Sequence, residues 1–259
     1  KKQEQLALQI TADSIAKAIA ADTSAQINHQ TEQSEMYGQM APFMEGKESF
    51  YTLENEVVKM TLTNKGGRIF SVELKDYKTH DGLPLVLFEG AENRFGFPFT
   101  HNTRVFNTND LYFTLHNQTD TSVVFAINSA MGEQLAFRYE LPQKQHMARF
   151  SIETQNLGNL ISTPRSSFDF FWDMKMPSFE KGRSFEQKYS GVFYKFFKDE
   201  VDWLSAGSSD EEDLRTKIRW VAFKAQFFSS VFIANESFAS ARVSTKLEED
   251  ETSPYLRYN

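Results

Sequence analysis

The 259-residue sequence contains no cysteine and only 12 glycines. The absence of cysteine excludes disulfides, thiolate zinc sites, iron–sulfur clusters and cysteine nucleophiles, although it does not identify a cellular compartment. No glycine-rich phosphate-binding motif is present, neither GxGxxG nor GxxxxGK[ST]. The formal net charge is -7 and no basic block interrupts the sequence. Nucleic acid is therefore not expected as a partner.

Long hydrophobic runs are also missing. The longest nearly apolar run, 83–88, contains Pro84, and a membrane-spanning helix needs roughly 18 or more apolar residues. No signal peptide with a basic start and an apolar middle is present. Because the first residue is Lys1 rather than Met, we expect the sequence to be part of a longer protein.

Phenylalanine is abundant, with 25 residues, and apolar side chains alternate with polar ones from residue 49 onward. Val58, Met60 and Leu62 alternate with Lys59, Thr61 and Thr63, which places one apolar and one polar face on a strand. The same alternation occurs at 111–115, 123–127, 135–141 and from 150, and clusters of turn residues separate these runs. The pattern predicts an all-β fold, an antiparallel sandwich of two sheets.

The first 45 residues differ from the rest. Residues 1–34 contain no aromatic side chain, and Leu8, Ala12, Ile15 and Ile19 have helical spacing. This stripe is too narrow to bury much surface. We therefore expect residues 1–45 to form a helical or disordered tether that follows a membrane span outside the sequence, and residues 46–259 to form the β domain.

Two stretches beyond residue 163 resist the simple pattern. Strands are expected at 191–197 and 220–234, and a short helix at 208–217, with Ser209 as its cap and Glu212 three residues later. The segment 220–234 is the most apolar long stretch, and a core strand or strand pair explains it without exposure. The tail 246–259, with acidic residues at 248–251, is expected to be a solvated loop.

Candidate catalytic residues do not form a known pattern. None of the histidines has HExxH or HxH spacing, no serine lies in GxSxG, and Asp81-Gly82 and Asp110 lack calcium-loop spacing. Three acidic residues among aromatics could belong to a glycosidase or a carbohydrate-binding cleft. Alternatively, Phe168, Phe170 and Trp172 fill the core while Asp169 and Asp173 face water, and we favour this interpretation. The candidates weighed were His29, His80, His101, His116 and His146, together with Asp169, Asp173 and Glu180. We therefore expect no catalytic, cofactor-binding or metal-binding residue, and the sequence leaves the binding residues unassigned.

Four segments of the sequence are distinctive. They are Leu62-Thr63-Asn64-Lys65-Gly66-Gly67-Arg68-Ile69, Arg149-Phe150-Ser151-Ile152-Glu153-Thr154-Gln155-Asn156, Gly191-Val192-Phe193-Tyr194, and Trp220-Val221-Ala222 followed by Gln226, Phe227 and Phe228. Together they resemble the large periplasmic domain of YidC-type membrane protein insertases. Their order and spacing from about residue 54 to 234 carry the resemblance. At the glycine pair, one residue is expected to need a positive φ to turn the chain.

The resemblance implies a twisted two-sheet β-supersandwich with galactose-mutarotase-like architecture. It implies a non-catalytic domain on the periplasmic side of the bacterial inner membrane, held between the first and second spans of an insertase. The implied partners are the membrane core of the same insertase, Sec translocon subunits and nascent membrane proteins, with the isolated domain monomeric. More strands and a helix follow the Trp-Val-Ala segment in the family, so the resemblance also implies a C-terminal truncation here.

Two alternatives stay open at this point. A carbohydrate-binding or mutarotase-like domain would need a histidine, such as His101, His116 or His146, facing a carboxylate in an open cleft. A surface sandwich with structural duty alone would need no site.

Overall fold

The computed structural model describes residues 17, 19, 21–23, 28, 31–159, 161, 168–198, 200–247 and 255–258. The chain separates into two compact units, Lys1–Gly46 and Lys47–Asn259. In the first unit, residues 31–37 are helical and lead into the 3-10 helix η1 (Gly38–Met40) and the short helix α2 (Ala41–Met44), with Pro42 in its first turn. None of the described helices combines the length and the apolar composition that a membrane span needs.

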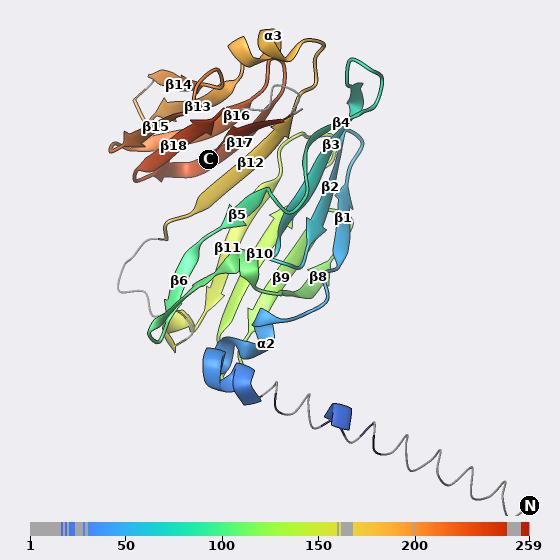
Figure 1. Ribbon diagram of the computed structural model, residues 1–259, viewed down its shortest axis with the longest axis vertical. Helices are drawn as coiled ribbons and strands as arrows, with labels where there is room; N and C mark the ends of the chain where they lie inside the picture. Colours follow the sequence, from blue (N-terminus) through green and yellow to red (C-terminus); the bar gives the residue numbers. More distant parts are fainter. Residues whose placement is uncertain are drawn as a thin grey trace, which may run out of the picture. The chain divides into compact units, whose positions relative to one another are not determined.

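The second unit is built from antiparallel strands (Figure 1). Its first half contains β1 (Phe50–Glu54), β2 (Val58–Thr63), β3 (Arg68–Lys78), β4 (Pro84–Glu89), β5 (Arg94–Gly96), β6 (Pro98–His101), β7 (Arg104–Asn107), β8 (Thr114–Gln118), β9 (Ser122–Asn128), β10 (Gln134–Glu140) and β11 (Arg149–Gln155). Its second half contains β12 (Phe171–Pro177), β13 (Gly191–Phe196), β14 (Val201–Ser205), β15 (Asp210–Leu214), β16 (Ile218–Lys224), β17 (Ser229–Phe238), β18 (Ala241–Lys246) and β19 (Tyr255–Tyr258). Short helical turns occur at η2 (Thr108–Asp110), η3 (Leu157–Asn159) and α3 (Arg183–Lys188).

Hydrogen bonding joins these strands into sheets. Two sheets are meanders with the orders β1-β2-β3-β4 and β11-β10-β9-β8. The other two large sheets have the orders β15-β18-β19-β12-β5 and β14-β13-β16-β17, and β6 pairs with β7. The all-β antiparallel fold predicted from alternation is confirmed, and the strand pair expected within 220–234 is the β16–β17 hairpin.

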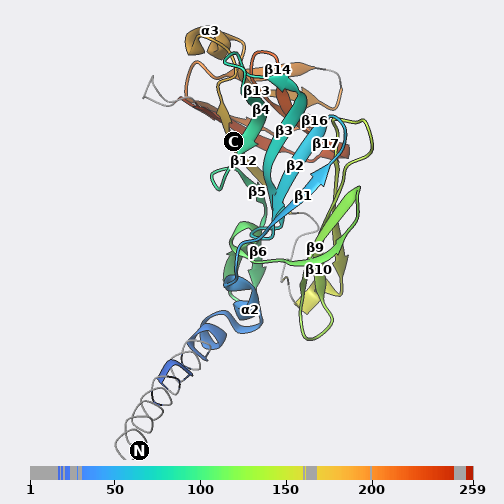
Figure 2. The ribbon, with the colours of Figure 1, turned by 90° about the vertical axis from the view of Figure 1, so that its right-hand side faces the viewer.

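The two meanders contact each other through side chains of facing strands, and Figure 2 shows them as separate sheets. Tyr51 of β1 meets Phe125 of β9 with ring centroids 5.4 Å apart. The buried Tyr139 hydroxyl on β10 donates a hydrogen bond of 2.8 Å to the carbonyl of Gly67. Gly66 and Gly67 have φ of 80° and 57°, so the positive φ predicted for the β2–β3 turn is confirmed.

A chain of aromatic contacts connects the meanders to the other sheets. Phe95 of β5 lies 5.1 Å from Phe150 of β11 and 5.4 Å from Phe232 of β17, measured between ring centroids. The ring of Trp172 on β12 lies tilted against that of Phe223 on β16, with centroids 4.2 Å apart. Because aromatic rings bury large apolar areas, this chain ties β5, β11, β12, β16 and β17 into one body.

A second large core lies between the sheet of β14-β13-β16-β17 and the strands that face it. Its buried members include Leu85, Leu87, Met174, Met176, Val192, Tyr194, Leu204, Leu214, Phe223 and Val243. On β13 the members Val192 and Tyr194 are two positions apart, so the residues next to them, such as Phe193, point to the opposite face of that sheet.

Two sequence-based expectations were wrong. The helix expected at 208–217 is instead strand β15, whose residues pair with β18. Leu214 is buried in the core and Asp213 bonds Arg242 across the strands, so tertiary pairing overrides the local helix signals. The loop expected at 246–259 contains β19, which pairs with β12 and β18. The acidic residues 248–251 lie outside the described residues.

Candidate interaction surface

The histidines weighed in the sequence do not converge. His80 bonds the Phe179 carbonyl at 3.2 Å, and His101 is buried beside the Phe106 ring. His116 and His146 are exposed and form no hydrogen bond or ion pair with a described residue. His29 lies outside the described residues. Within the described part of the chain, no three His, Asp or Glu side chains are placed to hold a metal ion.

The acidic residues near 170 accompany core aromatics. Phe170 contacts Phe95 at 4.5 Å between ring centroids, while the Asp169 side chain is exposed. Asp173 is half-buried and lies 3.9 Å from the Arg94 guanidinium. Phe168 is more exposed than predicted, although its ring lies 4.6 Å from Phe97. Glu180 is half-buried.

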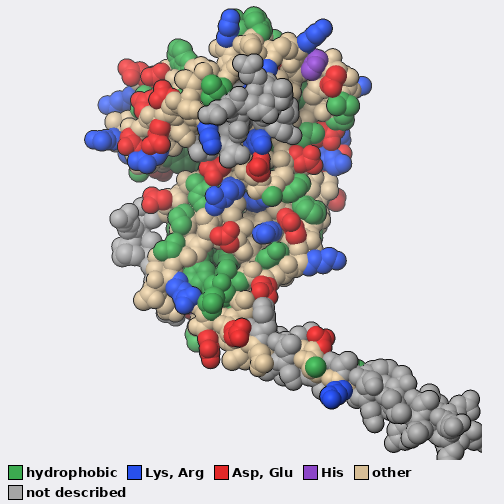
Figure 3. Space-filling model, in the orientation of Figure 1, with side chains coloured by type: hydrophobic (Ala, Val, Ile, Leu, Met, Phe, Trp, Pro, Cys, Tyr) green, Lys and Arg blue, Asp and Glu red, His purple; other side chains and the backbone are tan. Residues whose placement is uncertain are grey.

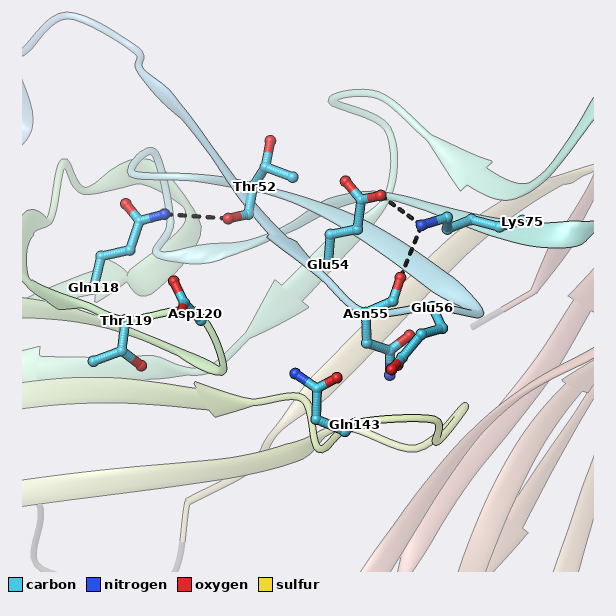
Figure 4. A pocket seen from close by; sticks show the side chains of 9 residues that line it. All are labelled: Thr52, Glu54, Asn55, Glu56, Lys75, Gln118, Thr119, Asp120 and Gln143. Carbon is cyan, nitrogen blue, oxygen red and sulfur yellow. Dashed lines mark hydrogen bonds and ion pairs between the residues drawn. The ribbon is translucent and has the colours of Figure 1, made fainter.

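A polar cavity of about 580 Å³ opens beside the end of β1 (Figure 4). Its Lys75 ammonium bonds the Glu54 carboxylate at 2.6 Å and the Asn55 carbonyl at 2.9 Å, and Gln118 donates to the Thr52 carbonyl. The Lys75 hydrogen bond lowers the pKa of Glu54. The lining residues are Thr52, Glu54, Asn55, Glu56, Lys75, Gln118, Thr119, Asp120 and Gln143, and they include no imidazole.

The outer face of β14-β13-β16-β17 carries a second feature, an exposed apolar surface. Strand register sets side chains in rows across this sheet. In one row, Phe193 lies opposite Trp203 and Ala222, and Ala222 lies opposite Val231. In the next, Lys195 lies opposite Val201 and Trp220, and Trp220 lies opposite Ile233. The neighbouring row contains Gly191, Ser205, Lys224 and Ser229. We call the side chains of these three rows the outer face.

Large apolar side chains remain open to solvent here. The exposed fractions are 56% for Trp203, 47% for Val231 and 40% for Ile233. Between the edge strands β14 and β17, Phe193 and Trp220 are half-buried and Ala222 is buried. A single exposed apolar residue needs no explanation, but apolar side chains along both edges of one sheet face make that face a candidate interaction surface.

Lys224 joins this face to helix α3. Its ammonium lies 5.4 Å from the centroid of the Phe193 ring and donates hydrogen bonds to the carbonyls of Tyr189 (2.8 Å) and Gln226 (3.2 Å). Burial lowers the pKa of Lys224. Tyr189 in turn contacts Phe185 of α3 at 5.3 Å between centroids, and both rings are about half exposed. The aromatic surface therefore extends from the sheet to α3.

Other exposed strands carry charge instead. On β15 and β18, Arg242 pairs with Glu211 and Asp213 at 3.5 and 2.7 Å. Figure 3 shows acidic and basic side chains interspersed around these strands. The outer face contains no carboxylate at any of its strand positions, so the apolar character belongs to one sheet face.

Sequence reasoning missed this surface. Segment 220–234 was expected to be core, yet only alternate residues such as Phe223 and Phe232 face inward. Because the run is apolar throughout, its sequence does not distinguish the residues that face the core from those on the outer face. The sequence does place Val231 and Ile233 two residues apart, on one face of a strand. Only the strand register shows that this face, which Trp203 shares, is the exposed one.

Comparison with known proteins adds the following findings. The YidC periplasmic domain family matches residues 51–258. The chain is 36% identical over 212 residues to a membrane protein insertase YidC of Parabacteroides distasonis, covering 81% of this chain and 34% of that protein. It is 34% identical over 253 residues to a membrane protein insertase YidC of Phocaeicola vulgatus, covering 98% of this chain and 40% of that protein. The chain thus spans between 34% and 40% of the length of these two relatives.

Among solved structures, a galactose mutarotase-like protein from Lactobacillus casei aligns with a TM-score of 0.51 and 11% identity. The alignment covers 81% of this chain and 86% of that protein. At this identity the likeness shows the fold alone.

Proposed function

The chain belongs to the YidC periplasmic domain family, and from this premise we propose that it acts as a non-catalytic contact domain of a membrane protein insertase. The domain lies on the periplasmic side of the bacterial inner membrane. It assists the insertion and folding of membrane proteins by binding, and it carries out no covalent chemistry.

The outer face is the observation that carries this proposal. Exposed aromatic and branched side chains, Trp203, Val231 and Ile233 among them, lower their free energy when another apolar surface covers them. A face of this kind favours binding to another apolar surface. The relatives, named as insertases, move polypeptides into a bilayer, and that task calls for contact surfaces.

The partners proposed are the membrane core of the same insertase, Sec translocon subunits and nascent membrane proteins. Strands β1, β14 and β17 end their sheets, and an extended polypeptide can add to such an edge through backbone hydrogen bonds. Protein partners can therefore bind the domain at its edges as well as at its faces.

An insertion assay tests the proposal. In a full-length insertase that carries this domain, Trp203→Ser with Val231→Ser should reduce insertion of a dependent substrate several-fold. The matched control is Val105→Ser on β7, because Val105 is a more exposed valine, at 73%, away from the outer face. Full insertion with the double variant, and also with the whole domain deleted, would contradict a contact role.

Photo-crosslinking identifies the protein partners. The photoreactive residue replaces Val105, Met147 or Val201, the last on the edge strand β14. All three side chains are exposed. Adducts with translocon subunits or nascent chains at any position support protein binding by the domain. Their absence at all positions in an active insertase would contradict the proposed protein partners.

In the part of the chain that the structure describes, nothing beyond the shared fold supports the carbohydrate-binding or mutarotase-like alternative. The polar cavity presents acids, amides and Lys75 without an imidazole, and the shared fold with a mutarotase-like protein does not transfer an activity.

A further inference from the structure

We propose that the outer face of β14-β13-β16-β17 docks on the surface of an anionic lipid bilayer. The inference rests on the proposed function, because it takes the domain to work beside a membrane. It goes further by naming the chemical class that this particular face contacts.

The side chains on this face are those that favour the membrane–water boundary. Trp203 and Trp220 are two of the three tryptophans in the sequence, and both belong to the outer face. Indole rings concentrate at bilayer interfaces, where an apolar ring and a polar N–H meet tail and headgroup. The third tryptophan, Trp172, is partly buried and packs against the core, with its ring tilted on that of Phe223.

Charge on the face points to the same ligand. Its ionisable strand residues are Lys195 and Lys224, and no carboxylate occupies its positions. The chain as a whole has 28 basic and 35 acidic residues. A cationic, carboxylate-free face on an acidic protein is complementary to anionic headgroups. The Lys195 stem can extend to the headgroups while aromatic rings enter the interface. The Lys224 ammonium is held by the carbonyls of Tyr189 and Gln226, so it contributes its positive charge from that place.

The geometry favours a lipid surface over an added peptide strand at this face. Backbone groups of β13 and β16 already pair with strands on both sides, so the face offers side chains in three rows and few backbone hydrogen bonds. A peptide strand gains most of its binding from backbone pairing at an edge. A bilayer interface instead contacts many side chains at once.

Vesicle binding by the chain itself is the direct test. Vesicles of phosphatidylethanolamine with phosphatidylglycerol should co-sediment the protein more strongly than vesicles of phosphatidylcholine, and added salt should weaken binding. The tryptophan emission should shift to the blue, and lipids brominated in the acyl chain should quench it, because Trp203 and Trp220 enter the interface. Trp172 should contribute little to either change.

Matched variants locate the contact. Val231→Ser should weaken vesicle binding several-fold, whereas Val105→Ser, an exposed valine on β7, should leave it unchanged. Lys195→Glu should weaken binding by about fivefold or more, the effect expected for one lysine near an anionic surface. Lys59→Glu, an exposed lysine on β2, is its control. Unchanged urea midpoints of the valine variants show that folding is intact.

Several results would overturn the inference. One is that the chain does not bind anionic vesicles, and another is that outer-face and control variants lose vesicle binding equally. The others are that the chain dimerises through the same face, or that a photoreactive residue at position 203 crosslinks to a protein in place of lipid. A protein crosslink at Trp203 would leave the proposed contact function standing. If the outer-face variants lose insertion but still bind vesicles normally, the lipid inference fails and the proposed contact function stands.

Discussion

The indole ring of Trp203 stacks on the ring of Phe193, with centroids 5.9 Å apart and planes only 13° from parallel. The two residues are direct cross-strand partners on β14 and β13. Register thus fixes an exposed indole in one orientation, held against a neighbouring ring. An interaction surface with rings already ordered loses less entropy when it binds.

This arrangement predicts unequal costs for removing tryptophans. Trp203→Ala should lower the free energy of unfolding by about 1 kcal/mol, since it removes one cross-strand aromatic pair. Trp172→Ala should cost more, about 3 kcal/mol, because the partly buried indole packs against the core beside Phe223. Urea unfolding followed by circular dichroism measures both. Similar costs for the two variants would contradict the placement of Trp203 outside the core.

The β2–β3 turn should not tolerate a side chain at Gly67. A Cβ there would lie 3.1 Å from Phe113 and 3.2 Å from Phe137, at a φ of +57°. Gly67→Ala should therefore cost the strain of a positive φ, about 1–2 kcal/mol, and a further overpacking cost of about 1–3 kcal/mol. Gly82→Ala is the control, because Gly82 also has a positive φ, yet its Cβ would meet nothing within 4 Å. Equal midpoints in urea would show that the rings yield without cost.

The Tyr139 hydroxyl should matter although it catalyses nothing. Tyr139→Phe leaves the buried Gly67 carbonyl without the hydrogen bond that Tyr139 donates, which should cost about 1–3 kcal/mol. Tyr77→Phe is the control, since the exposed Tyr77 keeps its ring contact with Phe228. Chemical denaturation of the two variants should separate them clearly.

The burial of Tyr139 also predicts how stability changes at alkaline pH. Burial raises the pKa of Tyr139 above its ordinary value. The unfolded chain loses this proton near pH ~10, while the folded chain retains it. The unfolded state is therefore favoured as pH rises above that value, and stability falls. Tyr139→Phe should lose less stability than the unsubstituted protein between neutral and strongly alkaline pH. An identical pH dependence would contradict the burial of this hydroxyl.

The Arg138–Glu153 pair predicts an acid-dependent contribution. Arg138 Nε lies 2.5 Å from Glu153 Oε1, and this hydrogen bond lowers the pKa of Glu153. The stabilisation is present above the ordinary glutamate pKa and is lost as pH falls through the lowered one. Arg138→Gln should cost at most about 1 kcal/mol at pH ~7, because the pair is partly exposed, and less in acid. Arg149→Gln on the neighbouring strand is the control, and an equal pH profile for both variants would speak against the pair.

Much of the fold could be predicted from alternation. The runs at 58–62, 123–127 and 135–141 coincide with β2, β9 and β10, because each has one face in the core. The strand expected at 111–115 begins later, at Thr114, although Leu111 and Phe113 are buried as the alternation implied. Strand β15 could not be predicted, since four successive acidic residues carry no alternation and their pairing with β18 is a tertiary fact.

The candidate surface could not be predicted for a related reason. In β16 and β17 both faces are apolar, so hydrophobicity does not separate Phe232, which contacts Phe95, from Ile233, which is exposed. Only the neighbours across each sheet face decide this, and they come from β5 and β12, far away in the sequence. The sequence shows that known catalytic motifs are absent from it, but it does not show which strand face is apolar and exposed.

Strand β19 has a mechanical consequence. Residues Tyr255–Tyr258 are hydrogen-bonded between β12 and β18. A pull transmitted along this segment would load two ladders of bonds in shear, the direction in which they must break together. Under a load in that direction, β19 could leave the sheet only after the hydrogen bonds on both of its sides had broken.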